Sequence, residues 1–276
     1  MEKMPLCSDG DAFHLLEQLE HILDCDPVID EVGFIHPSQL LTLNEEPDAA
    51  FLSPGKPEAD MRMSSEPSVA NQEGRYTFFW NRDHKLGIST ACLLPLYKAA
   101  KCKFMEALLI YKMNSNFSLK NDNRANSLLF SEIENEVIKL SKCLLLLSSD
   151  FGTAWNARKL IISKREEFSF SDELRMSSLV LSFAPKSENA WSYRRWIIKR
   201  IIGRCAILKK ILKEESKLVE KIAEKSKMNY RAWYHRCWLI SYMTAEQYRL
   251  CKSWMPLETG LHCMWPTTAA FIIVRN

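Results

Sequence analysis

The chain has 276 residues, enough for one large domain or two modest ones, and a core of that size needs no metal or disulfide to hold it together. Its 37 basic and 34 acidic residues give a net charge of only +3, which argues against nucleic acid as the main partner. The nine cysteines form no Cys-x-x-Cys pair, so we expect reduced thiols in a cytoplasmic protein. Because the cysteines and the six histidines are scattered along the sequence, we expect no metal site in this chain.

The N-terminal part predicts a helix and an extended segment, followed by a linker. Apolar residues recur at helical spacing from Phe13 to Leu23, and the next stretch, "DPVIDEVGFIHP", is bounded by prolines. Residues 44–75 contain four prolines and many small or acidic residues, so we expect a flexible linker that separates residues 1–43 from the rest. Since no stretch approaches 18 apolar residues, we expect no membrane span.

Residues 76–254 are predicted to form an α-helical repeat domain. From residue 128 onward the apolar residues follow helical spacing, interrupted by short breakers such as "SSDFG", "APKS" and "KSKMN". The polar stretch 113–127, "MNSNFSLKNDNRANS", is predicted to be a loop. No alternation of period two is long enough to predict a strand, and the expected fold class is therefore all-α.

Three stretches of this domain share the signature Ala-Trp-x-x-Arg: "FGTAWNARKLI", "SENAWSYRRWI" and "NYRAWYHRCWL". Each follows another apolar helix, so the repeats cover about 131–164, 171–203 and 209–243. The signature residues are Trp155, Arg158, Trp191, Arg194, Trp233 and Arg236. Self-similarity at this period predicts a stacked array of helical hairpins.

The residue types of the signature suit packing between hairpins. Tryptophan at position i and arginine at i+3 share one helix face, so the guanidinium can reach back to the ring or across to a neighbour. Ser187 and Asn229 can cap the helices that follow them. We interpret the signature as structural, because a stacked array spreads its tryptophans instead of gathering them at one ligand.

Two charged stretches allow other interpretations. The run formed by Arg194, Arg195, Lys199, Arg200 and Arg204 could bind an acidic partner, but it is interpreted as a solvated helix face. The glutamates of "KEESKLVEKIAEK" have lysines at helical spacing, which favours an exposed helix of no special function.

The signature, with Pro or Asn-Tyr just upstream, resembles the repeat of protein prenyltransferase α subunits, whereas the tetratricopeptide pattern is absent. The resemblance covers about residues 25–35 and 85–254. It implies a right-handed superhelical array of helical hairpins that forms a heterodimer with a β subunit, with the type II geranylgeranyltransferase β subunit as the favoured partner. In that family the β subunit holds zinc, which makes the acceptor cysteine a thiolate, so no cofactor is expected in this chain.

The resemblance also implies one substrate-binding residue. Pro185 and Lys186 precede Trp191 at the positions where family α subunits commonly carry Pro-Lys, and there the lysine faces the isoprenoid diphosphate. Two residues later Glu188 stands where the family often has tyrosine, and its carboxylate would disfavour a diphosphate. The alternative for Lys186 is a solvated lysine after a proline that ends a helix. No catalytic residue is assigned.

The predicted function is that of an α-type subunit of a protein prenyltransferase. Together with the β subunit it would support transfer of a farnesyl or geranylgeranyl group from an isoprenoid diphosphate to a cysteine of a protein substrate, and it would be inactive alone. The alternative is a non-catalytic interaction scaffold built of helical repeats. After the beginning of a further helix at "TAEQYRLCKSW", residues 255–276 carry no repeat signature. There we expect a divergent, alternative or truncated C-terminal tail and exposed apolar surface on the last hairpin.

Overall fold

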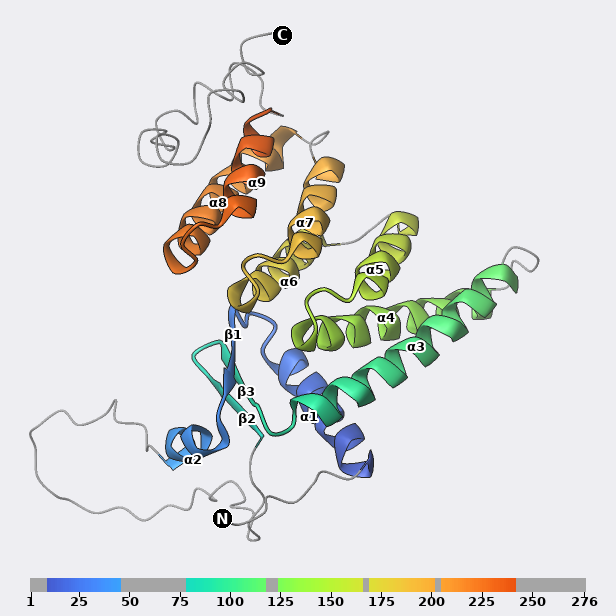
Figure 1. The fold of residues 1–276 in the computed structure, drawn as a ribbon. Coiled ribbons are helices and arrows are strands. Elements are labelled where there is room, and N and C mark those ends of the chain that lie inside the picture. The colour runs from blue at the N-terminus through green and yellow to red at the C-terminus, as the bar shows by residue number, and fades with distance from the viewer. Residues whose placement is uncertain (1–8, 46–77, 118–123, 166–168, 202–204, 242–276) are drawn as a thin grey trace, which may run out of the picture. The chain divides into compact units, whose positions relative to one another are not determined.

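Nine helices and three short strands make up the described part of the computed structural model, residues 9–45, 78–117, 124–165, 169–201 and 205–241 (Figure 1). The first elements are α1 (Asp9–Cys25), β1 (Glu31–Ile35), α2 (Pro37–Glu45), β2 (Phe79–Arg82), β3 (Lys85–Ser89) and α3 (Leu93–Phe117). The others are α4 (Arg124–Leu147), α5 (Gly152–Lys164), α6 (Phe170–Phe183), α7 (Glu188–Ile201), α8 (Cys205–Lys225) and α9 (Tyr230–Ser241). The dominance of helix confirms the predicted fold class.

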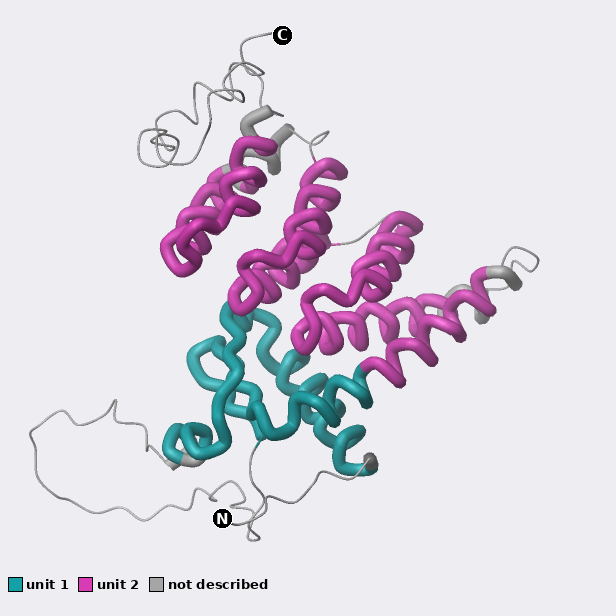
Figure 2. The backbone as a smooth tube through the Cα atoms, viewed as in Figure 1, with its two compact units in different colours: residues 1–100 teal, residues 101–276 magenta. Residues whose placement is uncertain are grey.

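The chain divides into two compact units, residues 1–100 and 101–276 (Figure 2). The first unit takes in β2, β3 and the start of α3, residues that the sequence assigned to the repeat domain beginning at 76. Helix α2 extends to Glu45, so the first two residues of the predicted linker are helical. The rest of that linker and the predicted tail 255–276 lie outside the described residues.

The first unit contains a mixed three-stranded sheet in the order β1-β3-β2. Strand β1 runs parallel to β3, with Glu31 opposite Lys85, and β2 runs antiparallel to β3. A Cβ at Gly87 would meet the end of the Ile35 side chain, which would have to shift, so β3 passes β1 closely at this glycine. The extended segment that contains β1 was predicted, but β2 and β3 were not, because strands of four and five residues are too short to show alternation.

A tight turn joins β2 to β3. Its two central residues, Asp83 and His84, both have left-handed backbone conformations, with φ of 51° and 60°. Such a turn fits the twist of a two-residue hairpin but usually contains Asn-Gly. Here the His84 ring nitrogen Nδ1 lies 3.0 Å from a carboxylate oxygen of Asp26, and the His84 carbonyl accepts a hydrogen bond from the Asp30 N–H. These contacts hold a turn that the residue types alone do not predict.

The second unit contains the rest of α3 and a stack of three helical hairpins, α4–α5, α6–α7 and α8–α9 (Figure 1). Within each hairpin the two helices contact each other. Between hairpins the first helices contact one another (α4 with α6, α6 with α8), and so do the second helices (α5 with α7, α7 with α9). The unit is therefore an array of two layers of helices, as a repeat of helical hairpins predicts.

Most hairpin turns follow the predicted breakers, but one predicted loop is shorter than expected. Helix α3 continues to Phe117 and α4 already begins at Arg124, so the polar stretch 113–127 is helical at both ends. Ser187 and Asn229 act as the predicted caps: the Ser187 hydroxyl accepts from the Ala190 N–H, and the Asn229 side-chain oxygen accepts from the Ala232 N–H.

Candidate functional site

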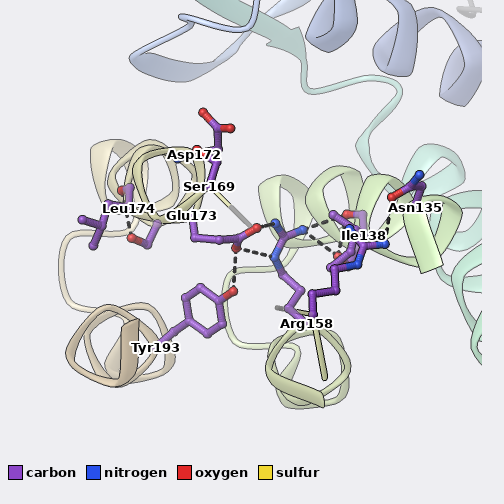
Figure 3. A network of polar contacts seen from close by, with 11 residues as sticks. Asn135, Ile138, Arg158, Ser169, Asp172, Glu173, Leu174 and Tyr193 are labelled. Carbon is purple, nitrogen blue, oxygen red and sulfur yellow. Dashed lines mark hydrogen bonds and ion pairs between the residues drawn. The ribbon is translucent and has the colours of Figure 1, made fainter. Parts of the chain in front are cut away.

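A buried polar network joins the first hairpin to the second, and the signature arginine Arg158 is its centre (Figure 3). The Nε and Nη2 atoms of Arg158 donate to the two carboxylate oxygens of Glu173, at 3.1 and 2.6 Å. Its Nη1 donates back into its own hairpin, to the Ile138 carbonyl at 2.7 Å and the Ser141 hydroxyl at 2.8 Å. The Tyr193 hydroxyl donates to Glu173 at 2.5 Å. Residues of α4, α6 and α7 thus meet in one network around this arginine of α5.

The second interface repeats this arrangement with different residues. Arg194 forks onto Glu215, at 2.6 Å from Nε and 2.5 Å from Nη2. Its Nη1 donates to the Leu174 carbonyl, 20 residues earlier, and to the Ser177 hydroxyl, 17 residues earlier, the same separations as at Arg158. The imidazole Nε2 of His235 lies 2.9 Å from Glu215 and replaces the tyrosine hydroxyl. Because each charge is paired and hydrogen-bonded, both arginines can be buried.

The electrostatics of the second network fix its protonation state. Burial would raise the pKa of Glu215, but Arg194 and His235 outweigh that effect and hold it at about 2. Burial lowers the pKa of His235, and the hydrogen bond to Glu215 offsets this only in part. The imidazole is therefore neutral at neutral pH, and its Nε2 carries the proton that it donates to the carboxylate.

The signature tryptophans fasten each second helix to the turn before it. The indole N–H of Trp155 donates to the Ser149 carbonyl at 2.8 Å, and that of Trp191 donates to the Pro185 carbonyl at 2.9 Å. The Pro185 carbonyl also accepts from the side-chain amide of Asn229, at 2.8 Å, in the next turn along the array. Both indoles satisfy their single donor inside the fold, so their polar atoms are used for structure.

The same tryptophan rings also contact the following hairpin. The ring centroid of Trp155 lies 4.7 Å from that of Tyr193, and the ring centroid of Trp191 lies 4.9 Å from that of His235. Tyr193 and His235 each stand one residue before the signature arginine of their own repeat. Trp155 and Trp191 are 2% and 0% exposed, so both rings are packed inside the fold.

The third repeat departs from this pattern. Trp233 is only half-buried, and the guanidinium of Arg236 lies over its ring, 5.6 Å from the centroid. The Nη1 of Arg236 is 3.9 Å from a carboxylate oxygen of Glu220 in its own hairpin, a long ion pair. Three large side chains near the start of this helix are exposed: Met228, Tyr230 and Tyr234. The last described hairpin thus exposes apolar surface, as expected.

The turn between α6 and α7 contains Lys186, the residue predicted to bind the diphosphate. Lys186 is exposed there, just before the start of α7. The carboxylate of Glu188 is occupied: one oxygen lies 2.5 Å from Nη2 of Arg195 and the other 3.1 Å from Nε of Arg231. Two guanidinium groups, from α7 and α9, therefore offset the negative charge that counted against a diphosphate at this turn.

Two predictions about charged faces are wrong. Arg194, at 4% exposed, is buried and Arg195 largely so, because α7 turns this side toward the next hairpin; Arg200 is exposed as predicted, and Arg204 lies outside the described residues. Glu215, in the stretch predicted to be a solvated face, is 1% exposed and holds Arg194. The spacing of charges within one helix could not predict the burial of Arg194 or of Glu215, because the partner of each lies in another hairpin.

The sequence could have pointed to some of the network residues. Tyr193 and His235 occupy the same position of the aligned signatures, which is a visible signal. The glutamates give no such signal, because they stand at different distances from their arginines: Glu173 follows Arg158 by 15 residues, and Glu215 follows Arg194 by 21. Among the described residues, no three His, Cys, Asp or Glu side chains are grouped closely enough to hold a metal ion. Nor is any of the described helices long and apolar enough to cross a membrane.

Residues 170–201 and 212–243 match the protein prenyltransferase alpha subunit repeat family. These ranges correspond to the second and third hairpins and contain Arg194 and Arg236. These two hairpins are similar to protein prenyltransferase alpha subunit repeats. The hairpin α4–α5 lies outside the matched ranges, but its Arg158 makes the same contacts as Arg194, so it is a further unit of the same array.

The relatives of the chain fall into two groups. Protein prenyltransferase alpha subunit repeat-containing protein 1-B of Xenopus laevis is 28% identical over 203 residues, which cover 65% of this chain and 43% of the relative. The human protein prenyltransferase alpha subunit repeat-containing protein 1 is 27% identical, with 65% and 46% covered. The geranylgeranyl transferase type-2 subunit alpha of Mus musculus is 25% identical over 116 residues, 39% of this chain and 20% of that one. The chain thus spans less than half the length of these relatives.

Proposed function

We propose that this chain acts as an α-type subunit of a protein prenyltransferase. Similarity to a subunit named for geranylgeranyl transfer, combined with an exposed lysine at the matching turn, supports this role. The chain would form a heterodimer with a zinc-bearing β subunit, preferably that of the type II geranylgeranyltransferase. The pair would transfer a farnesyl or geranylgeranyl group to a cysteine of a protein substrate.

The charge around Lys186 carries the proposal. Lys186 precedes Glu188 by two residues, and the Glu188 carboxylate is paired with both Arg195 and Arg231, so cations outnumber carboxylates among these residues. The net positive charge at this turn suits an isoprenoid diphosphate, and the fixed ion pairs of Glu188 keep its carboxylate directed at the arginines. The ammonium of Lys186 is exposed beside the start of α7, where a diphosphate oxygen could reach it.

In the proposed reaction the acceptor cysteine would attack the first carbon of the isoprenoid, and the zinc that the β subunit would hold makes that sulfur a better nucleophile. The bond from that carbon to the diphosphate breaks, and negative charge grows on the diphosphate oxygens. A lysine ammonium placed at those oxygens stabilises the departing group more than the bound substrate. Lys186 would contribute this stabilisation, while the repeats hold the turn in place.

The test is co-expression of the full chain with a type II geranylgeranyltransferase β subunit, followed by size-exclusion chromatography and a prenyl-transfer assay. We expect a one-to-one complex that transfers lipid to a cysteine-containing protein. Lys186→Ala should lower the transfer rate at least tenfold without dissociating the complex, since removal of one charge-stabilising donor typically costs that much or more.

Lys227→Ala is the matched control, because Lys227 is an exposed lysine in the corresponding turn of the next repeat. It should leave both the complex and the transfer rate unchanged. An active complex in which Lys186→Ala and Lys227→Ala behave alike would contradict the diphosphate role of Lys186 but leave the subunit role standing.

A non-catalytic scaffold is the second candidate, and the burial of the signature favours it. Trp155, Arg158, Trp191 and Arg194 spend their polar atoms on packing between hairpins and leave none for a substrate. A scaffold predicts binding of partner proteins without lipid transfer. A stable complex with the β subunit that remains inactive toward both isoprenoid diphosphates would favour this alternative.

A further inference from the structure

Two arginines from neighbouring hairpins share one carboxylate at the start of α7. The Nη2 atom of Arg195, in α7, donates to one oxygen of Glu188 at 2.5 Å. The Nε atom of Arg231, in α9, donates to the other oxygen at 3.1 Å. Glu188 therefore bridges the second and third hairpins, and its carboxylate holds two guanidinium groups close to each other.

The carboxylate of Glu188 uses only part of the hydrogen-bonding capacity of the two arginines. A guanidinium carries five N–H donors, and Glu188 accepts from one nitrogen of each arginine. The Nη1 atom of Arg195 is buried and has no hydrogen-bond partner within the described part of the chain. The two arginines together can therefore bind an anion that has more oxygens than a carboxylate.

The three members of the bridge differ in how firmly they are held. The side chain of Arg195 is 13% exposed and its guanidinium packs over the ring of Tyr234, 5.1 Å from the centroid. The side chains of Glu188 and Arg231 are 52% and 45% exposed. Water and salt screen such an exposed ion pair, so little free energy is lost when it breaks. Glu188 can therefore leave the arginines at small cost, while Arg195 stays in place.

We propose that Glu188 is a displaceable counter-ion, which occupies Arg195 and Arg231 until a diphosphate group takes its place. Lys186 precedes Glu188 by two residues, so an anion that binds the lysine ammonium arrives within a short length of chain from the bridge. A diphosphate carries more charge and more acceptor oxygens than the carboxylate it replaces. This inference rests on the proposed function, because the anion is the diphosphate assigned to Lys186.

The exchange of anions gives the third hairpin a part in the site. In the free chain Arg231 of α9 contacts the start of α7 through Glu188, and in the bound chain it does so through the diphosphate. The carboxylate competes with the anion for the same donors, so it lowers the affinity for a free diphosphate. A counter-ion that returns to the arginines therefore favours release of the diphosphate after transfer.

Calorimetric titration of the full chain with inorganic pyrophosphate, in the absence of any β subunit, tests the exchange. Glu188→Gln should bind pyrophosphate roughly fivefold more tightly, because the anion no longer has to break exposed ion pairs. Adding Arg231→Met should remove this gain, because both substitutions act on the same contact. Glu136→Gln is the matched control: it removes an exposed glutamate of α4, changes the net charge equally and should leave the affinity unchanged.

Three results would overturn the proposal. They are an affinity of Glu188→Gln that equals or falls below that of the unaltered chain, an equal gain from Glu136→Gln, and a gain that persists when Arg231→Met is added. Glu188→Ala, which also lacks the carboxylate, should reproduce the gain and guards against a local effect of glutamine. Lipid transfer by the heterodimer is a separate measurement: a complex that transfers none contradicts the proposed function, whereas pyrophosphate binding by the chain alone decides the role of Glu188.

Discussion

The second and third hairpins carry the same Ala-Trp-x-x-Arg signature, yet their arginines have different surroundings. Arg194 is held by four groups from two hairpins, among them the buried carboxylate of Glu215. Arg236 has a distant glutamate, the face of an indole and one buried nitrogen without a partner among the described residues. The signature therefore fixes where an arginine stands, whereas the next helix decides how strongly it is bound.

The largest difference in stability is expected between substitutions of two glutamates in helix α8. Glu215→Gln should lower the free energy of unfolding by about 3–5 kcal/mol, because it leaves Arg194 buried without its counter-charge. Glu220→Gln should cost less than about 1 kcal/mol, because its ion pair with Arg236 is long and Glu220 is half-exposed. Urea denaturation followed by circular dichroism measures both. Equal losses would mean that the two arginines are bound alike.

Lowering the pH should weaken the second interface by less than the Glu215→Gln substitution does. His235 has a lowered pKa, so the unfolded chain takes up its proton first and stability begins to fall below about pH 6.5. Glu215, with its pKa lowered from 4.5 to about 2, contributes stability that is present above pH 4.5 and lost as the pH falls toward 2. Urea midpoints measured from pH 7 to pH 3 should follow this decline.

Variants separate the two steps of that decline. His235→Phe should flatten the change that begins near pH 6.5, and Glu215→Gln should remove the part that begins near pH 4.5. Glu220→Gln should keep both. A profile of His235→Phe that still falls between pH 6.5 and 5 like that of the unaltered chain would assign the first step to another group.

A smaller effect is expected from the tryptophans. Trp191→Phe should cost about 2 kcal/mol, since the ring is fully buried and its N–H donates to the Pro185 carbonyl. Trp233→Phe should cost less than about 1 kcal/mol, because Trp233 is only half-buried. The unfolding free energies of the two variants give the comparison. A greater loss from Trp233 would show that the end of the array is covered in solution.

The smallest difference between the two repeats is expected at their helix caps. Ser187→Ala and Asn229→Ala should each cost about 1 kcal/mol, because each removes a helix cap. Each side chain also bonds to the preceding turn, Ser187 to Asp150 and Asn229 to Pro185, so the two costs should be similar. Thermal denaturation of the two variants checks this. A clear difference would show that the turns, like the arginines, become weaker toward the end of the array.

Much of the fold follows from the sequence, because the information is local. Helical spacing, breakers and caps identify the hairpins, and the repeated Trp and Arg identify their common packing. The sheet was missed because β2 and β3 are short and because the turn at Asp83 and His84 is held by Asp26, far away in the sequence. Helix α2 was not predicted either, because its nine residues are too few to show a helical apolar spacing.

The candidate site is less predictable, because its contacts join distant parts of the chain. Lys186 and the signature residues could be named, but the pairing of Arg194 with Glu215 could not, since Glu215 stands among lysines that suggest a solvated helix. The same is true of Glu188, whose carboxylate appeared to oppose an anion until Arg195 and Arg231 were found beside it. Single-residue arguments fail where a charge has its partner in another hairpin.

The unequal separations of the two arginine–glutamate pairs have a consequence for the evolution of such arrays. Glu173 follows Arg158 by 15 residues and Glu215 follows Arg194 by 21, yet both forks have nearly the same geometry. The same fork forms although Glu173 lies in the first turn of α6 and Glu215 is the eleventh residue of α8. An array of this kind can therefore gain residues at the start of a first helix, ahead of its glutamate, while the order and alignment of the units persist.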